Sequence, residues 1–286
     1  MPYVIMTLTV LCGCIKGGCG KKISGYADTN DKAVLFNSIR MLLCIAIGAV
    51  MVLAQGDGFA VSLGMLGVST LGGLCNAVFL ICWLFAVQKN RLVTVDVALM
   101  LGAIIPSVLC AVCFGQALSA WKMVGFSVLL AATAVLAGKS HSKGLLFMAL
   151  AAVGEGMVGF AQQMYIAWYG NTYALPVYHF YVYVFTAAAL LISYTFLRRP
   201  EPVSLKKPLP FLAIMAVCLF AAGYLQTVAT ARYNVSAQVL YPVLKGGSLI
   251  ATNLMAALFF KEKMTARTLL GTAIAVVGII LMGVMI

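Results

Sequence analysis

Ten apolar runs follow one another along this chain, and each is close to the length that a helix needs to cross a membrane. About 20 consecutive apolar residues span the hydrocarbon layer of a bilayer as a helix. The runs occupy residues 2–20, 33–54, 62–87, 92–114, 118–137, 144–167, 173–197, 209–230, 234–260 and 265–286. Only 9% of the 286 residues are charged, whereas a soluble domain carries roughly a quarter. The sequence therefore predicts an all-α integral membrane protein with ten transmembrane helices.

Little of the chain remains for a soluble domain. The longest polar connector, Arg198 to Pro210, contains four prolines and is predicted to be a loop. The nine Cys residues lie mostly inside the apolar runs, where Cys acts as a small hydrophobic residue. We therefore expect no disulfide framework, no metal site and no cofactor, and an activity that takes place inside the membrane.

The basic residues gather on one side of the predicted membrane. With their flanks, the odd-numbered connectors carry fifteen of the 19 Lys and Arg residues, and Arg40 is counted here with the flank of the first connector. Basic loops stay in the cytoplasm. This distribution predicts a multi-pass protein of the cell (plasma or inner) membrane with both termini outside the cytoplasm. Because the charges alternate with apolar runs, they indicate loop anchoring and not nucleic-acid binding.

An internal repeat is visible at an offset of 146 residues. It aligns Gly115–Gly125 (GQALSAWKMVG) with Lys261–Gly271 (KEKMTARTLLG), and each stretch enters a final apolar run. Five spans per repeat is an odd number, so two copies would lie inverted in the membrane. We predict two inverted five-helix repeats around a central cavity, the first at 1–138 and the second at 144–286.

The closing segment, Asn234–Ile286, resembles the last two helices of EamA-type carriers in the drug/metabolite transporter (DMT) superfamily. The matching features are Pro242, the acidic Phe260–Glu262 end of the ninth run, and Gly271 and Gly278 in the tenth. The resemblance implies a ten-helix inverted-repeat carrier with a central cavity. It implies no substrate, because the superfamily transports amino acids, metabolites, nucleotide sugars and drugs.

The chain departs from that family pattern in two ways. The end of the first repeat has Gln116 where the family often has Glu. Many members are thought to keep both termini in the cytoplasm, whereas the basic residues here predict the opposite orientation.

Three ionisable residues lie near the middle of predicted spans, where a charge is costly and marks a functional site by default: Glu155, Lys245 and Lys16. A Glu155–Lys245 pair would be structural, or would be opened by substrate. An unpaired Glu155 would instead bind and release protons, which makes it a proton-coupling candidate. Lys16 and Lys245 suit an anionic or zwitterionic substrate, although Lys16 could also snorkel to the membrane boundary.

A polar stripe follows one face of the predicted span 234–260, at spacings of three and four residues. Its members are Asn234, Gln238, Tyr241, Lys245, Ser248 and Thr252. Such a stripe either faces a cavity or holds helices together through hydrogen bonds. We predict cavity lining, with Gln238, Tyr241, Lys245 and Ser248 contacting substrate.

Other polar and aromatic residues inside the runs are candidates for the same lining, with packing as the alternative. They are Asn76, Trp83, His179, Tyr183 and Gln226. His179 either carries a proton or makes a single hydrogen bond. Gln162 lies two turns beyond Glu155 on the same side of its helix. For Asp96, close to Lys89 and Arg91, we favour a local ion pair at the cytoplasmic mouth over a coupling carboxylate.

These features favour a secondary-active transporter that moves a small polar or charged organic metabolite by alternating access. An amino-acid-like, anionic or zwitterionic substrate is favoured, and coupling to protons stays open. The alternatives are a multidrug or organic-cation exporter of the same fold, an integral membrane enzyme or a scaffold. An enzyme would need acid/base or metal clusters such as H-E-x-x-H, which the sequence lacks. The expected partners are the small-molecule substrate, the lipid bilayer and, if coupling occurs, protons, and we expect a monomer.

Overall fold

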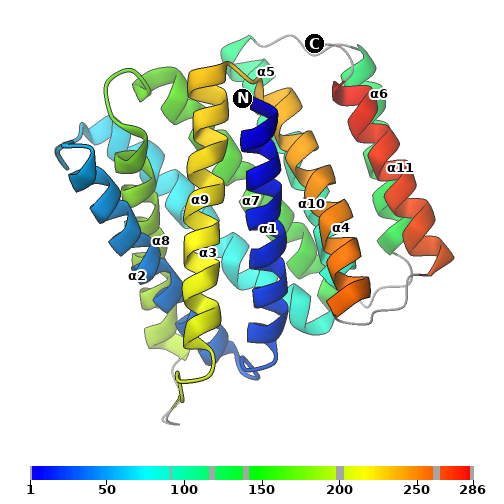
Figure 1. Cartoon of the computed structure of the whole chain (residues 1–286), viewed down its shortest axis with the longest axis horizontal. Coiled ribbons are helices and arrows are strands. Elements are labelled where there is room, and N and C mark those ends of the chain that lie inside the picture. Colours follow the sequence, from blue (N-terminus) through cyan, green and yellow to red (C-terminus); the bar gives the residue numbers. More distant parts are fainter. Residues whose placement is uncertain are drawn as a thin grey trace.

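The computed structural model describes residues 2–90, 92–115, 120–137, 142–197, 203–259 and 265–283, and this part of the chain is a bundle of helices with short connections (Figure 1). The helices are α1 (Pro2–Ser24), α2 (Asn30–Ala54), α3 (Leu63–Lys89), α4 (Leu92–Met100), the short 3₁₀ helix η1 (Leu101–Ala103), α5 (Ile104–Phe114), α6 (Ala120–Ala137), α7 (Ser142–Tyr169), α8 (Leu175–Leu197), α9 (Leu209–Tyr233), α10 (Ala237–Phe259) and α11 (Ala266–Gly283). The predicted all-α fold is confirmed. Gln116 and Phe260–Glu262 lie outside the described residues.

Six helices in the described part of the chain are long and apolar enough to cross a membrane: α1, α2, α3, α7, α8 and α9. Shorter apolar stretches lie at Ala98–Phe114, Met123–Ala132 and Leu269–Gly278. Large apolar side chains cover the outside of the bundle, among them Val50 at 64% and Leu254 at 60% exposure. A surface of this kind is matched to lipid and not to water.

The fourth predicted span, residues 92–114, is not one continuous helix. It is divided into α4 and α5 by the 3₁₀ turn at Leu101–Ala103. Pro106 lies in the first turn of α5 and has no backbone N–H to donate to the carbonyl four residues earlier, that of Gly102. The missing hydrogen bond explains why the helix changes its winding here and leaves a backbone carbonyl beside α7.

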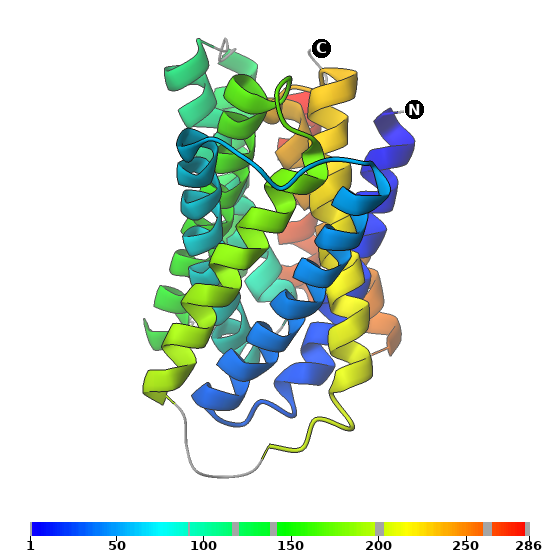
Figure 2. The same ribbon diagram turned by 90° about the vertical axis from the view of Figure 1, so that its left-hand side faces the viewer.

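The helices run nearly along one direction, so the bundle has two ends (Figures 1 and 2). The N-terminal end carries the start of α1 and the connectors 55–62, 170–174 and 234–236, and the last residues of α11 lie there too. The opposite end carries the connectors 25–29 and 203–208. Among the described basic residues, Lys21, Lys22, Lys206 and Lys207 lie at this opposite end, which we call the basic end.

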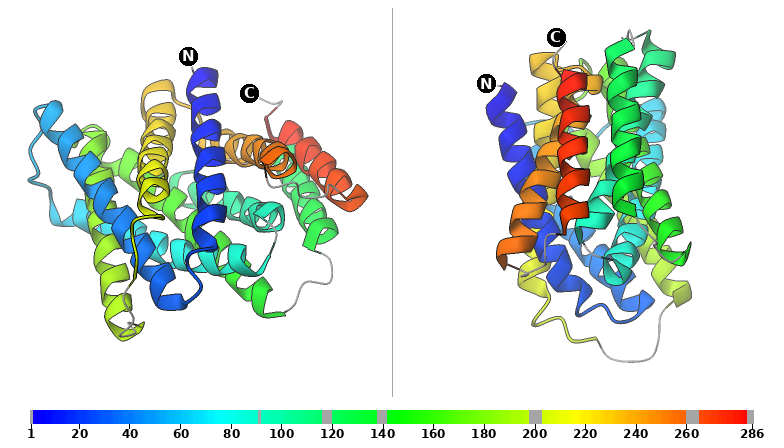
Figure 3. Two further views of the ribbon diagram at one scale, coloured as in Figure 1. Left: turned by 60° about the horizontal axis from the view of Figure 1, so that its bottom comes forward. Right: turned by 90° about the vertical axis from the view of Figure 1, so that its right-hand side faces the viewer.

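Four helix pairs dominate the packing: α3 with α7, α1 with α9, α2 with α8 and α6 with α11. The α6–α11 pair forms one edge of the bundle (Figure 3). A β-carbon on Gly278 of α11 would lie 3.1 Å from the carbonyl oxygen of Gly125 on α6. The small residues that end the two predicted repeats therefore let these helices approach closely.

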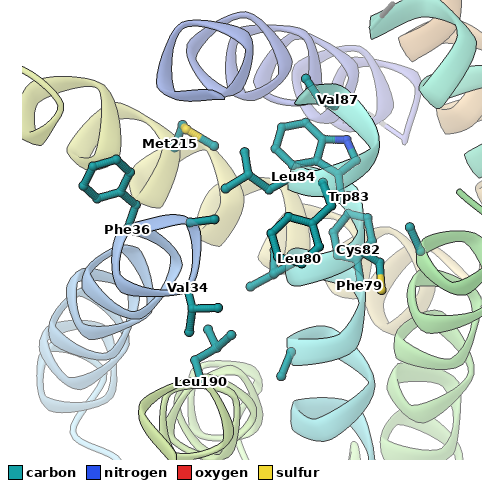
Figure 4. Packing of buried hydrophobic residues seen from close by; sticks show 14 of the residues in the cluster. Val34, Phe36, Phe79, Leu80, Cys82, Trp83, Leu84, Val87, Leu190 and Met215 are labelled. Atoms are coloured by element: carbon teal, nitrogen blue, oxygen red, sulfur yellow. The ribbon is translucent and has the colours of Figure 1, made fainter. Parts of the chain in front are cut away.

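The largest core cluster joins α2, α3, α8 and α9 (Figure 4). Trp83 is 4% exposed within it, and its indole ring lies against Gly20 of α1, where a β-carbon would have no room. Leu80 and Leu84 of α3 and Met215 of α9 pack in the same cluster. This core fixes α3 beside the helices that carry the polar residues described below.

Arg40 corrects one sequence interpretation, since it does not belong to the flank of a connector. It is the eleventh residue of α2 and only 1% exposed. Its Nη2 donates to Asn37 Oδ1 at 2.7 Å, and Asn37 Nδ2 donates to the Leu80 carbonyl at 3.3 Å. Because α2 begins at Asn30 and packs against α3, α8 and α9, the guanidinium lies deep in protein and cannot reach a membrane surface.

Candidate functional site

A cavity of about 120 Å³ lies inside the bundle, between α1, α3, α5, α7, α8, α9 and α10. Its polar and aromatic lining residues are Lys16, Asn76, Phe79, Glu155, Gln162, Tyr178, His179, Tyr183, Gln226, Tyr241 and Lys245. Eight residues of this set were predicted to bind substrate: Lys16, Asn76, Glu155, His179, Tyr183, Gln226, Tyr241 and Lys245. The polar positions predicted from six different helices thus meet around one cavity.

An ion pair crosses this cavity between Lys245 Nζ on α10 and Glu155 Oε1 on α7. Each side chain is 21% exposed, so both remain in contact with the cavity. The second carboxylate oxygen, Glu155 Oε2, is buried and has no hydrogen-bond partner among the described residues. A carboxylate can accept several hydrogen bonds, so Glu155 retains capacity for a further donor.

Glycines on either side of Glu155 bring α7 close to three other helical segments. A β-carbon on Gly154 would lie 2.9 Å from the Cys75 carbonyl oxygen of α3, and one on Gly156 would lie 2.5 Å from the Gly102 carbonyl oxygen of η1. Gly159 contacts the Tyr241 ring of α10 in the same way. The Gly154-Glu155-Gly156 sequence therefore places an acidic side chain where α7 packs closely against α3 and η1.

Lys16 reaches the cavity from α1. Its Nζ lies 5.7 Å from the centre of the Phe79 ring, within range of a cation–π contact. It interacts electrostatically with Glu155, Lys245, Arg40 and Asp96. The structure therefore places Lys16 at the cavity and not at the membrane boundary to which it could have snorkelled.

His179 belongs to a hydrogen-bonded cluster in the cavity wall. Thr227 Oγ1 donates to the Gly223 carbonyl at 3.0 Å, and lies 2.8 Å from Gln162 Nε2 and 2.9 Å from His179 Nε2. A hydroxyl donates one hydrogen bond and accepts two. With the Thr227 proton given to the Gly223 carbonyl, both nitrogens donate to Thr227 and His179 carries its proton on Nε2, whereas the other tautomer would accept the Thr227 proton instead. The hydrogen-bonded interpretation of His179 is the one that this geometry supports.

Two further hydrogen-bonded groups hold lining residues in place. Tyr241 OH donates to the Gly159 carbonyl at 2.9 Å and accepts from Gln163 Nε2 at 3.3 Å. Asn76 Nδ2 donates to Thr186 Oγ1 at 3.2 Å. These contacts join α7 to α10 and α3 to α8, so the same polar groups line the cavity and connect its helices.

Three predicted substrate contacts lie elsewhere. Trp83 is in the hydrophobic core described above. Ser248 lies beside Gly13 of α1, whose β-carbon would be 3.5 Å from Ser248 Oγ, and Gln238 is 2% exposed and does not line the cavity. The predicted polar stripe thus faces the cavity only at Tyr241 and Lys245. Asn234 is the exposed C-cap of α9 and lies before α10 begins at Ala237.

We expect Trp83→Ala to affect folding and leave binding intact. Truncation of a buried aromatic side chain costs about 3–5 kcal/mol, and Trp83 fills the space over Gly20. The unfolding free energy should fall by about this amount in a denaturation experiment in detergent. A ligand that stabilises the native protein should bind the folded fraction of this variant with unchanged affinity. A weaker affinity would show that Trp83 contributes to the binding site.

Asp96 was expected to pair with Lys89 or Arg91 at the mouth of the bundle, and Arg91 lies outside the described residues. The described charges that act on Asp96 are those of Lys245, Glu155 and Lys16, and its carboxylate faces Thr252 of α10. The Nζ of Lys89, one of its expected partners, lies 5.0 Å from the centre of the Phe147 ring instead. Asp96 therefore belongs electrostatically to the same group of charges as the ion pair.

Sequence reasoning also left Tyr178 and Arg40 out of the site. Tyr178 lines the cavity and stacks on Tyr165 with ring centres 4.4 Å apart. Arg40 does not line the cavity, yet it interacts electrostatically with Lys16 and with the lining residue Tyr183. Gln162, two turns from Glu155, was identifiable from helical spacing alone. Neither Tyr178 nor Arg40 gave such a periodic signal.

Comparisons with known proteins agree with this architecture. The model of the EamA-like transporter family matches residues 142–284, which is half of the chain. Among solved structures 28 chains match, and one crystal structure aligns over 99% of this chain and 97% of its own, with a TM-score of 0.74 and 15% sequence identity. That likeness shows the fold alone. The search of curated proteins found no match.

Proposed function

Because the chain belongs to the EamA-like transporter family, and is thus a multi-pass membrane transporter of the DMT superfamily, we propose that its substrate is a small anionic or zwitterionic organic metabolite. The substrate would bind in the cavity between Lys16, Lys245 and Glu155 and cross the membrane by alternating access. The observation that carries this proposal is the balance of charge around the cavity.

Five charged side chains of the described residues lie more than one turn from either end of their spans. They are the cations Lys16, Arg40 and Lys245 and the acids Asp96 and Glu155. The group carries one positive charge in excess when all five are ionised. Charge in a low-dielectric interior is stable only when it is compensated. A substrate carboxylate would supply the missing negative charge.

The remaining hydrogen-bonding capacity favours a zwitterion. Lys16 lines the cavity, and the described residues offer its Nζ no carboxylate within ion-pair distance. Glu155 Oε2 has no hydrogen-bond partner among them. A substrate carboxylate on Lys16 and a substrate ammonium on Glu155 would satisfy both groups at once.

The cavity also supports a small substrate. Its volume is about 120 Å³, whereas sites for drug-sized ligands are roughly 300–1,000 Å³. The rival candidate, an organic-cation exporter, draws support from the aromatic lining of Tyr178, Tyr183 and Tyr241, which could hold a cation over ring faces. The excess positive charge opposes that rival.

Two inverted five-helix repeats, 1–138 and 144–286, account for the packing. Inversion would exchange α1 with α7 and α3 with α9, which relates the α3–α7 pair to the α1–α9 pair. It would relate the α2–α8 and α6–α11 pairs each to itself. The cavity then lies where the repeats meet, as in alternating-access carriers. Helices of a single chain suffice to form the cavity, so the proposed transporter acts as a monomer.

Orientation and coupling complete the proposal. The basic end faces the cytoplasm of a plasma or inner membrane, and both termini lie outside, because basic residues concentrate at that end. Proton coupling through Glu155 requires its ion pair with Lys245 to open first, since a protonated carboxyl carries no charge for Lys245 to pair with. Transport that depends on a proton gradient in the native protein and loses that dependence in Glu155→Gln would identify the coupling residue.

A ligand panel tests the substrate class. Purified protein in detergent is heated with amino acids, small carboxylates, nucleosides or quaternary ammonium ions, and stabilisation is read as a shift in Tm. We expect small molecules that carry a carboxylate to stabilise the protein, and the active compounds to be taken up by proteoliposomes. Stabilisation by quaternary ammonium ions alone would favour the organic-cation exporter.

A further inference from the structure

Four of these five charges, all but that of Arg40, occupy related places in the two proposed repeats. Lys16 is the fifteenth residue of α1, and Glu155 is the fourteenth of α7. Asp96 is the fifth residue of the span made by α4, η1 and α5, and Lys245 is the ninth of α10. The last two differ by four residues, which is about one helical turn and keeps them on the same face. Each repeat thus carries one cation and one acid, with the signs exchanged.

Only one pair of these four charges is closed in this structure. Lys245 and Glu155, both from the second repeat, form an ion pair. Their counterparts in the first repeat, Asp96 and Lys16, interact electrostatically but make no ion pair within the described part of the chain. The contact given for the Lys16 ammonium is the Phe79 ring at 5.7 Å. The four charges therefore occupy symmetric positions in the two repeats, but only the pair of the second repeat is in contact.

We propose that Asp96 and Lys16 form the counterpart ion pair in the opposite-facing state, and that the Lys245–Glu155 pair opens when they do. This inference rests on the proposed alternating access between inverted repeats, in which the two repeats exchange conformations. Each state then leaves one cation free for the carboxylate of the substrate. The substrate carboxylate passes from Lys16 to Lys245, and no state leaves all four charges unpaired in low dielectric.

The proposal gives Asp96 a positioning role that differs in direction from that of Glu155. Asp96→Asn removes the pair that stabilises the opposite-facing state, so the population should shift toward the state seen here. Glu155→Gln removes the pair that stabilises the present state, so the population should shift the other way. Substitution of a residue that only supports the fold would not shift the two variants toward opposite states.

Hydrogen exchange followed by mass spectrometry, on protein in lipid nanodiscs without ligand, measures the shift. The peptides of interest cover 55–62 and 170–174 at the N-terminal end and 25–29 and 203–208 at the basic end. We expect exchange to rise at one end and fall at the other in Asp96→Asn, and the reverse in Glu155→Gln. The exposed pair of Lys32 Nζ and Asp28 Oδ1, 2.8 Å apart, supplies the control. Asp28→Asn should leave exchange unchanged in the peptides outside its own connector, namely 55–62, 170–174 and 203–208.

A charge exchange provides the second test, which holds even if a single variant folds poorly. Lys16→Asp and Asp96→Lys should each shift hydrogen exchange in the direction of Asp96→Asn, and the double variant should return toward the native exchange pattern because the pair is restored with its signs reversed. Shifts in the same direction for Asp96→Asn and Glu155→Gln, or a double variant no better than the singles, would overturn the proposal. Those results leave substrate binding by the native protein unaffected, so they are separable from a failure of the proposed function.

Discussion

Lys245→Met is expected to abolish ligand binding and to lower stability. The substitution removes the ammonium that faces both Glu155 and the cavity and leaves a carboxylate without its partner. Breaking a fully buried pair costs roughly 3–5 kcal/mol. Because each side chain here is 21% exposed, solvent screening should reduce the loss to about 1–3 kcal/mol. Denaturation in detergent measures the stability, and the ligand-induced shift in Tm measures binding.

A double variant separates the two effects. Lys245→Met combined with Glu155→Gln removes both charges, so most of the lost stability should return. Ligand binding should not return, because two of the three charged groups proposed to hold the substrate are gone and Lys16 alone remains. If Lys245→Met is still stabilised by the ligands that stabilise the native protein, the ion pair is structural and the binding site lies elsewhere.

Gly156→Leu is expected to prevent accumulation of folded protein. A β-carbon at this position would lie 2.5 Å from the Gly102 carbonyl oxygen and 2.8 Å from Ile105 Cβ. The helix backbone cannot move away locally, because the other contacts of α7 hold it in place. Even Gly156→Ala should cost about 1–3 kcal/mol through overpacking. Monodispersity after detergent extraction and denaturation midpoints measure both variants.

Gly67 of α3 is the matched control. It also lies inside a helix, and a β-carbon there would meet nothing within 4 Å. Gly67→Ala should therefore be neutral or stabilise the protein by about 0.5–1 kcal/mol, because alanine has less backbone freedom to lose. If Gly156→Ala behaves like Gly67→Ala, the close approach of α7 to η1 is not essential for folding.

The helices themselves could be predicted because length and apolarity determine which segments cross a membrane. The start of α2 at Asn30 and the end of α10 at Phe259 lie within a few residues of the predicted bounds. The break at Leu101–Ala103 was missed even though Pro106 is visible in the sequence. The break is caused by a single absent hydrogen bond, which does not change how apolar the segment is.

The site could be predicted only in part, for a different physical reason. Helical spacing shows which residues share a face, so Tyr241 and Lys245 were recognised together. It does not show which neighbour covers that face, and α1 covers Ser248. Arg40 and Asp96 were assigned to the membrane boundary because they lie near span ends in sequence. Their real surroundings depend on packing between distant helices.

The break in the fourth span has a mechanical consequence. The Gly102 carbonyl oxygen lies against Gly156, and the Ala152 carbonyl oxygen lies 2.5 Å from where a β-carbon on Gly102 would be. Backbone therefore meets backbone between η1 and α7, with no side chain that could change rotamer to let them slide. This backbone contact should make α7 and the fourth span move together, although they belong to different halves of the chain. The rigid bodies that move during transport are then expected to contain helices from both halves. A division of the chain between residues 138 and 144 would separate helices that move together.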